Sequence, residues 1–232
     1  MNNLPKSTLF IPEGLQQVLL HACCAPCSSA IVEWLVAHGI RPVIFYFNPN
    51  IYPREEYEIR KNESQRHADS LGIRWIDGDY DHDRWLQNIK GLEQEPERGK
   101  RCEMCFRYRL LQTAKTAQRE HITWFATTLA SSRWKNLDQI NSAGLWAEQQ
   151  VNNQAQSLSA DSPTMTPSAT LASSKPTDNP SVLQSGKTEF SDVCFWAQNW
   201  RKDGLQQRRN ELLKEYSFYN QQYCGCEFSV RN

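Results

Sequence analysis

Short apolar runs alternate with longer polar or amphipathic stretches along the first half of the chain. The apolar runs are rich in β-branched and aromatic residues, as buried strands are, and cover residues 17–21, 42–47, 73–76 and 121–126. The stretches between them predict helices over residues 31–36, from about residue 54 to 71, and over 102–120. Strands separated by helices pair in parallel through right-handed crossovers. The pattern therefore predicts a Rossmann-like α/β fold, a parallel sheet with flanking helices.

A strongly polar stretch interrupts this pattern at residues 151–188. It contains no aromatic residue, four prolines and many Ser, Thr, Asn and Gln residues. Such a composition buries too little apolar surface to offset the entropy of ordering it. We therefore expect a single domain formed by residues 1–150 and 189–232, with residues 151–188 as a flexible low-complexity insertion.

Polar residues follow each predicted strand, at the sheet edge where parallel sheets bind their ligands. In chain order they are Cys23, Cys24 and Cys27, then Asn48 and Asn50, then Asp77, Asp79 and Asp81, and finally Thr127, Thr128 and Ser131. We expect all of them to lie along one rim of the sheet.

Seven of the eight cysteines lie in three clusters, which are Cys23, Cys24 and Cys27, then Cys102 and Cys105, and finally Cys224 and Cys226. The N-terminal residues have no apolar stretch typical of a signal peptide, and no run of about 18 apolar residues predicts a membrane-spanning helix. We therefore expect a cytoplasmic protein with no membrane association and with reduced thiols. Clustered cysteines in that compartment favour metal binding or redox chemistry over a disulfide framework.

Cys102 and Cys105 open a predicted helix, where free backbone N–H groups and the helix dipole favour thiolates. Together with Cys23 and Cys24 they offer four thiolates, a set that suits structural zinc and an iron–sulfur cluster alike. The adjacency of Cys23 and Cys24 favours the larger cluster, but spacing alone does not decide between the two.

The remaining cysteines also have alternative roles. Cys27 fits a buried turn residue, a ligand of a second metal or a redox partner. A disulfide between Cys224 and Cys226 would close a tight ring that is easily reduced, which suits an electron relay, whereas two inert thiols are the alternative. Cys194 stands alone among apolar residues and fits the core.

Acidic and basic residues balance at 26 each, yet positive charge gathers locally. One basic cluster surrounds the second cysteine pair and another precedes the third, and their members are Arg98, Lys100, Arg101, Arg107 and Arg109, and Arg201, Lys202, Arg208, Arg209 and Lys214. Such clusters beside aromatic residues suit nucleic-acid phosphates and stacked bases, although solvated helix faces have the same composition.

Six blocks of the sequence resemble one known family in order and spacing. They are Leu20-His-Ala-Cys-Cys-Ala-Pro-Cys-Ser28, Phe47-Asn-Pro-Asn-Ile51, Arg101-Cys-Glu-Met-Cys-Phe-Arg107, Thr127-Thr-Leu129, Asn199-Trp-Arg-Lys202 and Tyr223-Cys-Gly-Cys-Glu-Phe-Ser229. The chain is similar to the QueH-type epoxyqueuosine reductases, which implies a HUP-like version of the Rossmann-like fold. The resemblance further implies reduction of epoxyqueuosine to queuosine at the wobble position of transfer RNA, with electrons from an unidentified donor.

The resemblance assigns roles to the clustered cysteines. It implies that a 4Fe-4S cluster is bound by four thiolates, those of Cys23, Cys24, Cys102 and Cys105, and that Cys224 and Cys226 form a redox-active disulfide. It also implies one additional mononuclear iron, for which Cys27 and either Asp79 or Asp81 are candidate ligands. One block departs from the family, because Ser132-Arg-Trp-Lys135 stands where Ser-Pro-Tyr-Lys is expected.

Two other functions and several proton donors stay open. An iron–sulfur tRNA thiolase needs a Ser-Gly-Gly-x-Asp-Ser loop after its first strand, where this chain has His21-Ala-Cys-Cys-Ala25. A zinc-stabilised RNA-binding module without catalysis is the non-enzymatic alternative. For an epoxide reduction the candidate proton donors are His21, Tyr46, Asp79 and Tyr223.

Overall fold

The computed structural model describes residues 8–160 and 191–229. Its strands are β1 (Gln17–His21), β2 (Arg41–Tyr46), β3 (Trp75–Asp77), β4 (Trp124–Thr127) and β5 (Cys194–Phe195), and its helices are α1 (Ala25–Ala37), α2 (Arg54–Ser70), α3 (His82–Asn88), α4 (Lys100–Arg119), α5 (Leu137–Ala160) and α6 (Leu205–Glu215), with two 3-10 turns at Thr128–Ser131 and Glu227–Ser229. The strands form one parallel sheet in the order β3-β2-β1-β4-β5. This confirms the predicted α/β fold.

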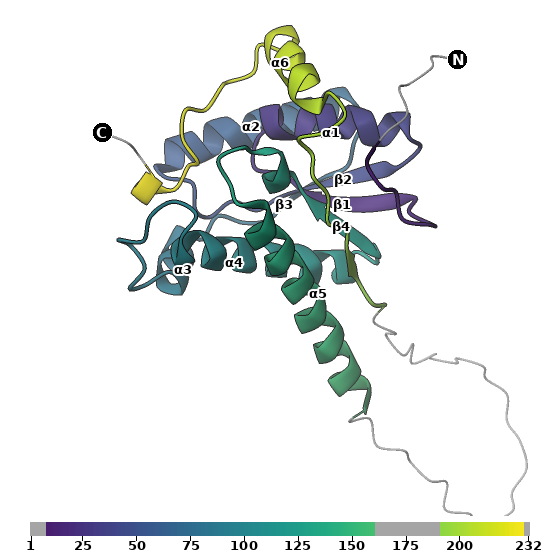
Figure 1. Ribbon diagram of the computed structural model, residues 1–232, viewed down its shortest axis with the longest axis vertical. Coiled ribbons are helices and arrows are strands. Elements are labelled where there is room, and N and C mark those ends of the chain that lie inside the picture. The colour runs from purple at the N-terminus through teal and green to yellow at the C-terminus, as the bar shows by residue number, and fades with distance from the viewer. Residues whose placement is uncertain (1–7, 161–190, 230–232) are drawn as a thin grey trace, which may run out of the picture.

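The helices cover both faces of the sheet (Figure 1). Helices α1 and α2 lie on one face, with α6 packed outside α1, and α3, α4 and α5 lie on the other. Because both faces are covered, the central strand is a continuous apolar run, and Val18, Leu19 and Leu20 of β1 are fully buried. The sequence pattern therefore found the four longest strands without difficulty.

Helix α1 begins earlier than predicted. It starts at Ala25, directly after the cysteines of the first loop, with Pro26 in its first turn. Proline is well suited to that position because its missing N–H has no partner inside the helix there. Cys27 is consequently a helical residue and not part of a free turn.

Helix α5 corrects the predicted start of the insertion. It continues to Ala160, and residues 151–160 are therefore helical. Ala143, Ala147, Val151 and Ala155 are buried, and their spacing of four keeps one narrow stripe of the helix against the domain. The sequence did not predict this stripe, because its apolar residues are small and isolated in a polar stretch. Residues 161–188, the rest of the expected insertion, lie outside the described residues.

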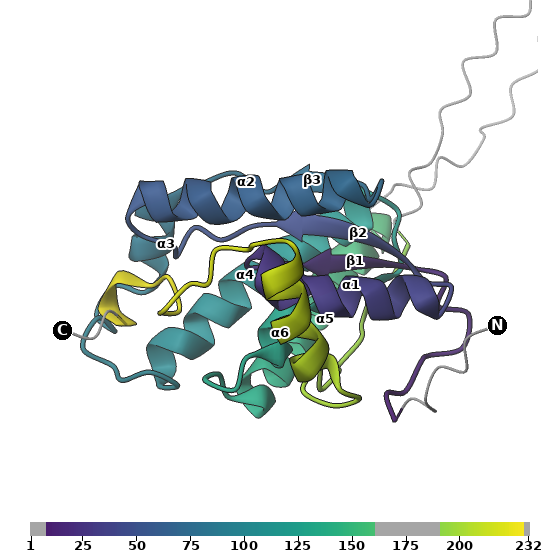
Figure 2. The same ribbon diagram turned by 90° about the horizontal axis from the view of Figure 1, so that it is seen from above.

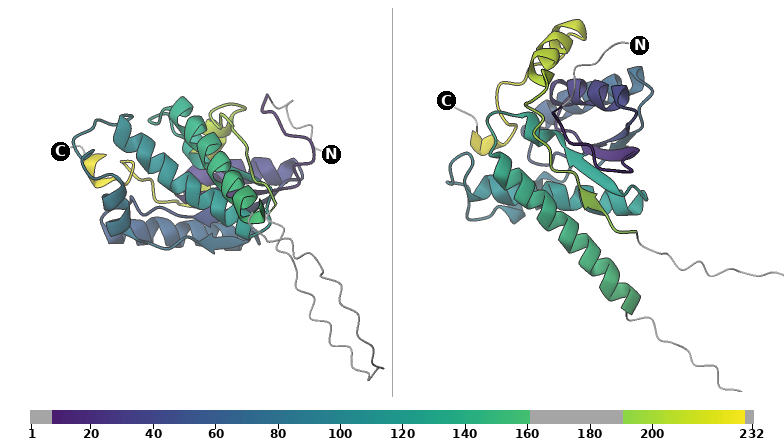
Figure 3. Two further views of the ribbon diagram at one scale, coloured as in Figure 1. Left: turned by 90° about the horizontal axis from the view of Figure 1, so that it is seen from below. Right: turned by 45° about the vertical axis from the view of Figure 1, so that its right-hand side comes forward.

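Strand β5 lies at the edge of the sheet beside the long helix α5 (Figure 3). The side chain of Asn152 bonds both backbone groups of Val193, at 2.9 and 3.0 Å, and Glu148 accepts the N–H of Phe195 at 2.6 Å. Gly144 of α5 has no room for a Cβ, which would lie 2.3 Å from the Phe195 ring. Cys194 is half-buried in this strand, so the expectation of a core position was wrong.

After α6 the chain runs back toward α3 (Figure 2). We call residues 216–229 the C-terminal segment. It carries Cys224 and Cys226 and contains only the short 3-10 turn as regular structure. This return brings the third cysteine cluster to the first two.

Candidate active site

The site lies where the strand order reverses. From β1 the chain adds β2 and β3 on one side and then β4 on the other. His21 and Thr127 are paired at the last position of the β1–β4 ladder, and the Cys23 N–H donates to the Thr128 hydroxyl at 3.3 Å. A sheet of this kind opens a crevice beyond the carboxyl ends of these two strands.

His21 braces this crevice from within the core. Its Nε2 lies 3.1 Å from the carbonyl oxygen of Phe47, and its Nδ1 lies 2.8 Å from the hydroxyl of Thr127. Burial, followed by the charge of Arg109, lowers the pKa of His21 to about 3. The neutral ring donates from Nε2 to the carbonyl and accepts from Thr127 at Nδ1. Both nitrogens are engaged, which disfavours His21 as a proton donor to substrate.

Three thiols meet at the start of α1. The sulfur atoms of Cys23, Cys24 and Cys27 all lie within 4.8 Å of one another, and those of Cys23 and Cys24 are 3.8 Å apart. Hydrogen bonds from Cys24 and then Cys27 lower the pKa of Cys23 well below its usual range, whereas burial raises that of Cys24. One favoured thiolate beside two thiol donors is an arrangement suited to metal ligation.

Cys102 and Cys105 occupy the first turns of α4. The N–H of Arg98 donates to the Cys102 sulfur at 3.3 Å. Cys105 is buried in a small apolar cluster with Trp85, Ile89 and Cys226. Burial raises the pKa of both thiols, that of Cys102 to about 11. The helix start therefore does not by itself yield thiolates here, contrary to the simple dipole argument.

The third cluster is fixed by contacts with the backbone of the C-terminal segment. Arg60 of α2 donates to the carbonyl oxygens of Tyr223 and Cys224 at 3.3 and 3.4 Å. The carbonyl of Gly225 accepts the N–H of Tyr52 at 2.8 Å. Gly225 has a φ of 100°, and a Cβ there would lie 2.8 Å from Ile51. Glycine is therefore required between the two cysteines.

The structure brings the predicted ligands together only in part. Among residues 8–160 and 191–229, Cys23, Cys24 and Cys27 form the one group of three close enough for a single ion. Cys102 lines a small cavity together with Lys135 and Cys224. Neither Cys102 nor Cys105 belongs to the group of three thiols. All eight cysteines are free thiols, so the Cys224–Cys226 disulfide stays a prediction.

The three aspartates after β3 have separate positions. Asp77 pairs with Lys61, and Asp81 caps α3 by accepting the N–H of Arg84 at 2.9 Å. Asp79 is exposed in the turn between them. None of these carboxylates belongs to the thiol group, so a carboxylate ligand also stays a prediction.

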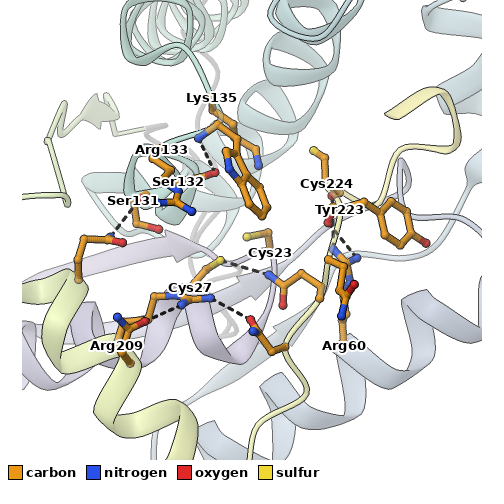
Figure 4. Close-up of a pocket in the computed structure, with 16 residues that line it drawn as sticks. Cys23, Cys27, Arg60, Ser131, Ser132, Arg133, Lys135, Arg209, Tyr223 and Cys224 are labelled. Carbon is orange, nitrogen blue, oxygen red and sulfur yellow. Dashed lines mark hydrogen bonds between the residues drawn. The ribbon is translucent and has the colours of Figure 1, made fainter. Parts of the chain in front are cut away.

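A cavity of about 480 Å³ connects the first and third cysteine clusters (Figure 4). Cys23, Cys27 and Cys224 line it together with four cationic side chains, those of Arg60, Arg133, Lys135 and Arg209. Trp134 and Tyr223 add aromatic surface, and no carboxylate is among the lining residues that the structure describes. A cationic cavity with exposed thiols attracts an anionic ligand to a redox or metal centre.

Sequence reasoning missed two polar residues that hold the site. Gln221 donates to the Cys24 sulfur at 2.8 Å, and Arg60 is 2% exposed although it lies in a helix of polar composition. Neither has a local sequence signal, because each acts on a segment more than 150 residues away. Lys135, by contrast, was visible in the departing Ser-Arg-Trp-Lys block.

The sequence matches the family model described as epoxyqueuosine reductase QueH over residues 18–161 and 152–232. The chain belongs to the QueH family. It is 38% identical to the epoxyqueuosine reductase QueH of Haemophilus influenzae, over 98% of this chain and 77% of that protein. It is 37% identical to the QueH of Acinetobacter baylyi over 98% of this chain and 87% of the relative, and 30% identical to that of Thermotoga maritima over 92% and 90%.

Membership of the QueH family confirms the resemblance that the six sequence blocks indicated. It identifies the chain as an oxidoreductase. The family name connects it to queuosine biosynthesis. Within residues 8–160 and 191–229, none of the helices combines the length and the apolar character needed to cross a bilayer.

Proposed function

We propose that this protein reduces epoxyqueuosine to queuosine at the wobble position of transfer RNA, the last step of tRNA queuosine biosynthesis. Two electrons and two protons remove the epoxide oxygen as water and leave a carbon–carbon double bond. The observation that carries this proposal is the cavity, which joins three thiols to four cations and has no carboxylate among its described lining residues. A polyanionic substrate and a thiol-held redox centre fit the same cavity.

The cluster proposed for this site is a 4Fe-4S cluster on Cys23, Cys24, Cys102 and Cys105. The donor chemistry fits, because all four residues are free thiols and sulfur is the preferred ligand of such clusters. When bound, the cluster supplies electrons one at a time. The grouping of Cys27 with Cys23 and Cys24 supports Cys27 as a ligand of an additional iron. Asp79 is the carboxylate we propose for it, since Asp81 already caps a helix.

Cys224 and Cys226 are proposed as a dithiol that forms the redox-active disulfide. Cys224 lines the cavity, whereas Cys226 is 6% exposed in the apolar cluster behind it. Oxidation of both thiols yields two electrons and two protons, which balances one epoxide reduction. An external donor, as yet unidentified, then returns the disulfide to the dithiol.

The rim of the cavity is suited to the substrate's phosphates and bases. Arg133 and Arg209 can contact phosphate oxygens, and the indole of Trp134 is 47% exposed beside them. Exposed aromatic rings next to cations bind unpaired nucleotides by stacking. Transfer RNA carrying epoxyqueuosine is therefore the proposed partner.

The decisive experiment measures iron, sulfide and zinc in protein purified without oxygen, together with conversion of epoxyqueuosine in transfer RNA by nucleoside mass spectrometry. We expect about four or five irons with sulfide, and activity. Cys102→Ala should lose the cluster and the activity together. Cys194→Ala, a change in β5 outside the cavity lining, is the matched control. An active variant without cluster would overturn the proposal, and one zinc without sulfide would favour the RNA-binding module.

The dithiol role has a separate test. Cys226→Ser should retain the visible absorption of the cluster while it slows multiple turnover at least tenfold. Unchanged multiple-turnover rates in that variant would remove the relay from the mechanism.

A further inference from the structure

Arg109 is a buried cation with no carboxylate partner among the described residues. It lies on α4, four residues after Cys105 and seven after Cys102, on the same helix face as both. Its side chain is 1% exposed, its Nη2 donates to the side-chain oxygen of Asn48, and its Nε has no hydrogen-bond partner. Among residues 8–160 and 191–229 it forms no ion pair.

A second buried arginine shows what is unusual about Arg109. Arg60 is 2% exposed, but its guanidinium lies 2.6 Å from the carboxylate of Glu56, which compensates its charge. A buried charge without such a partner is strongly destabilising, so natural proteins pair it or bind an ion to it. Arg109 therefore requires an anion that the described carboxylates do not supply.

The ionisable groups near Arg109 are the thiols of Cys23 and Cys105, His21 and the cation Lys135. Burial raises the pKa of Cys105, and the charge of Arg109 is the largest influence opposing it. The same charge also lowers the pKa of Cys23. His21 is neutral and already bonded at both nitrogens. The groups that can offer Arg109 a negative charge are thus the thiols of the two clusters, which lose their protons when they bind a metal.

Lys135 supplies a second positive charge from a different element. It lies in the loop before α5, lines the cavity with Cys23, Cys27 and Cys224, and forms no ion pair within the described residues. Arg201 fixes this loop by donating to the carbonyl oxygens of Ser132 and Lys135 at 2.5 and 2.8 Å. Two cations from different elements, Arg109 of α4 and Lys135 of the loop before α5, therefore lie near the thiols.

We infer that Arg109, aided by Lys135, is the counter-ion of the anionic metal–thiolate centre and sets its reduction potential. The inference rests on the proposed function. A four-iron cluster with four thiolates is dianionic in its oxidised form, and two neighbouring cations balance that charge. One electron from the donor adds one negative charge to the cluster, and fixed positive charge favours that step, since net charge is a main determinant of cluster potential.

The test compares Arg109→Met with the wild type, purified without oxygen. Redox titration of the visible spectrum should show a potential lower by at least about 59 mV, a tenfold shift in the ratio of reduced to oxidised cluster. Release of iron to a chelator should be several-fold faster. The metal-free variant should melt at the same temperature as the metal-free wild type or higher, because it no longer buries an unpaired charge. A purely structural arginine would instead lower that melting temperature.

Matched variants separate charge from shape. Arg109→Lys keeps the charge and should retain most of the wild-type potential. Arg119→Met changes an exposed arginine at the far end of the same helix and should leave the potential unchanged. If Arg109→Met does not fold, Arg109→Gln removes the charge and keeps a donor for Asn48.

The outcomes also separate this inference from the proposed function. A wild-type potential in the charge-removing variant overturns the counter-ion role, and an active wild-type enzyme with a cluster leaves the proposed function intact. A wild-type protein without iron and sulfide overturns both. A metal-free Arg109→Met that is much less stable than the metal-free wild type also overturns the counter-ion role.

Discussion

The β1–α1 loop and the C-terminal segment both bring cysteines to the cavity, but they are held by different forces. The loop continues a central strand, and the Ala22 N–H donates to the carbonyl of Phe45 at 3.0 Å as one more rung of the ladder. The C-terminal segment makes no strand pairing among its described residues. It is held mainly by side chains from α2 and α4, chiefly Arg60 and Arg101, that reach its carbonyl groups, and by the backbone hydrogen bond from Tyr52 to Gly225.

This difference determines how each region can open. Displacing the β1–α1 loop breaks the sheet, so its opening is expected only with global unfolding. The C-terminal segment can detach when its side-chain contacts and its backbone bond to Tyr52 break, because the sheet does not depend on it. We therefore expect the ligand cysteines of the loop to be rigid and the Cys224–Cys226 pair to open locally, which suits a pair that an external donor must reach.

The largest effect on the free energy of unfolding is expected from Leu20→Ala in β1, the central strand of the sheet. Leu20 is fully buried, and truncation of such a leucine leaves a cavity and costs about 3 to 5 kcal/mol. Guanidinium unfolding monitored by circular dichroism measures the loss. The matched control is Leu145→Ala, which changes a side chain that is 48% exposed and should cost under about 0.5 kcal/mol. Equal losses in the two variants would contradict the central role of β1.

Arg60→Met should loosen the C-terminal segment with a smaller global effect. It leaves Oε1 of Glu56 and two carbonyl groups without the Arg60 donor, while Oε2 of Glu56 still accepts from the Tyr219 hydroxyl, and the loss costs about 1 to 3 kcal/mol. Alkylation of Cys226, followed by mass spectrometry, should become several-fold faster, while that of Cys24 stays slow. The control is Arg54→Met, which removes an exposed ion pair with Glu58 nearer the start of α2. Equal acceleration at both cysteines would mean that the two regions do not open independently.

Acid should weaken the contact between α2 and the C-terminal segment. The His67 ring meets the rings of Tyr216 and Phe218 edge-on, with centroids 5.0 and 5.1 Å apart, and burial lowers its pKa below the ordinary value of 6.5. The unfolded chain then binds a proton more readily, so stability falls as the pH drops through 6.5, by at most about 1.4 kcal/mol per pH unit for one proton.

The control for this pH effect is His67→Gln, which lacks the titrating group. Its free energy of unfolding should fall less steeply between pH 7.5 and 5.5 than that of the wild type. His21 is also buried and neutral, but it contributes equally to both proteins. Parallel slopes would show that His67 does not titrate on unfolding.

The smallest effect is expected from Glu227→Gln. Its carboxylate lies 3.1 Å from Nε2 of a partly exposed His82, and exposed pairs of this kind contribute up to about 1 kcal/mol. We expect a small fall in melting temperature and a slight rise in the alkylation rate of Cys226. A loss as large as that of Arg60→Met would show that this ion pair, and not the arginine, holds the C-terminal segment.

The sequence was most informative where the chemistry is local. The four apolar strands, three of the helices between them and the thiols of Cys23 and Cys102 were predicted from spacing and composition, whereas the short helix α3 was not. Strand β5 was not, because two residues carry no periodicity. The last turns of α5 were hidden because Val151 and Ala155 are isolated apolar residues in a polar stretch. The sequence presented Arg60 as an ordinary charge of a polar helix and Arg109 as a member of a basic cluster, since burial is not visible in composition.

The sequence alone thus determined the parallel α/β architecture, the family and the supply of thiols, because periodicity, turn residues and cysteine spacing act over short distances along the chain. Only the tertiary structure decided that Cys102 and Cys105 stay outside the group formed by Cys23, Cys24 and Cys27, that the C-terminal segment returns to the cavity and that Arg109 is buried without a carboxylate partner among the described residues. These features depend on which distant segments share a cavity, and that is fixed by packing of the whole domain.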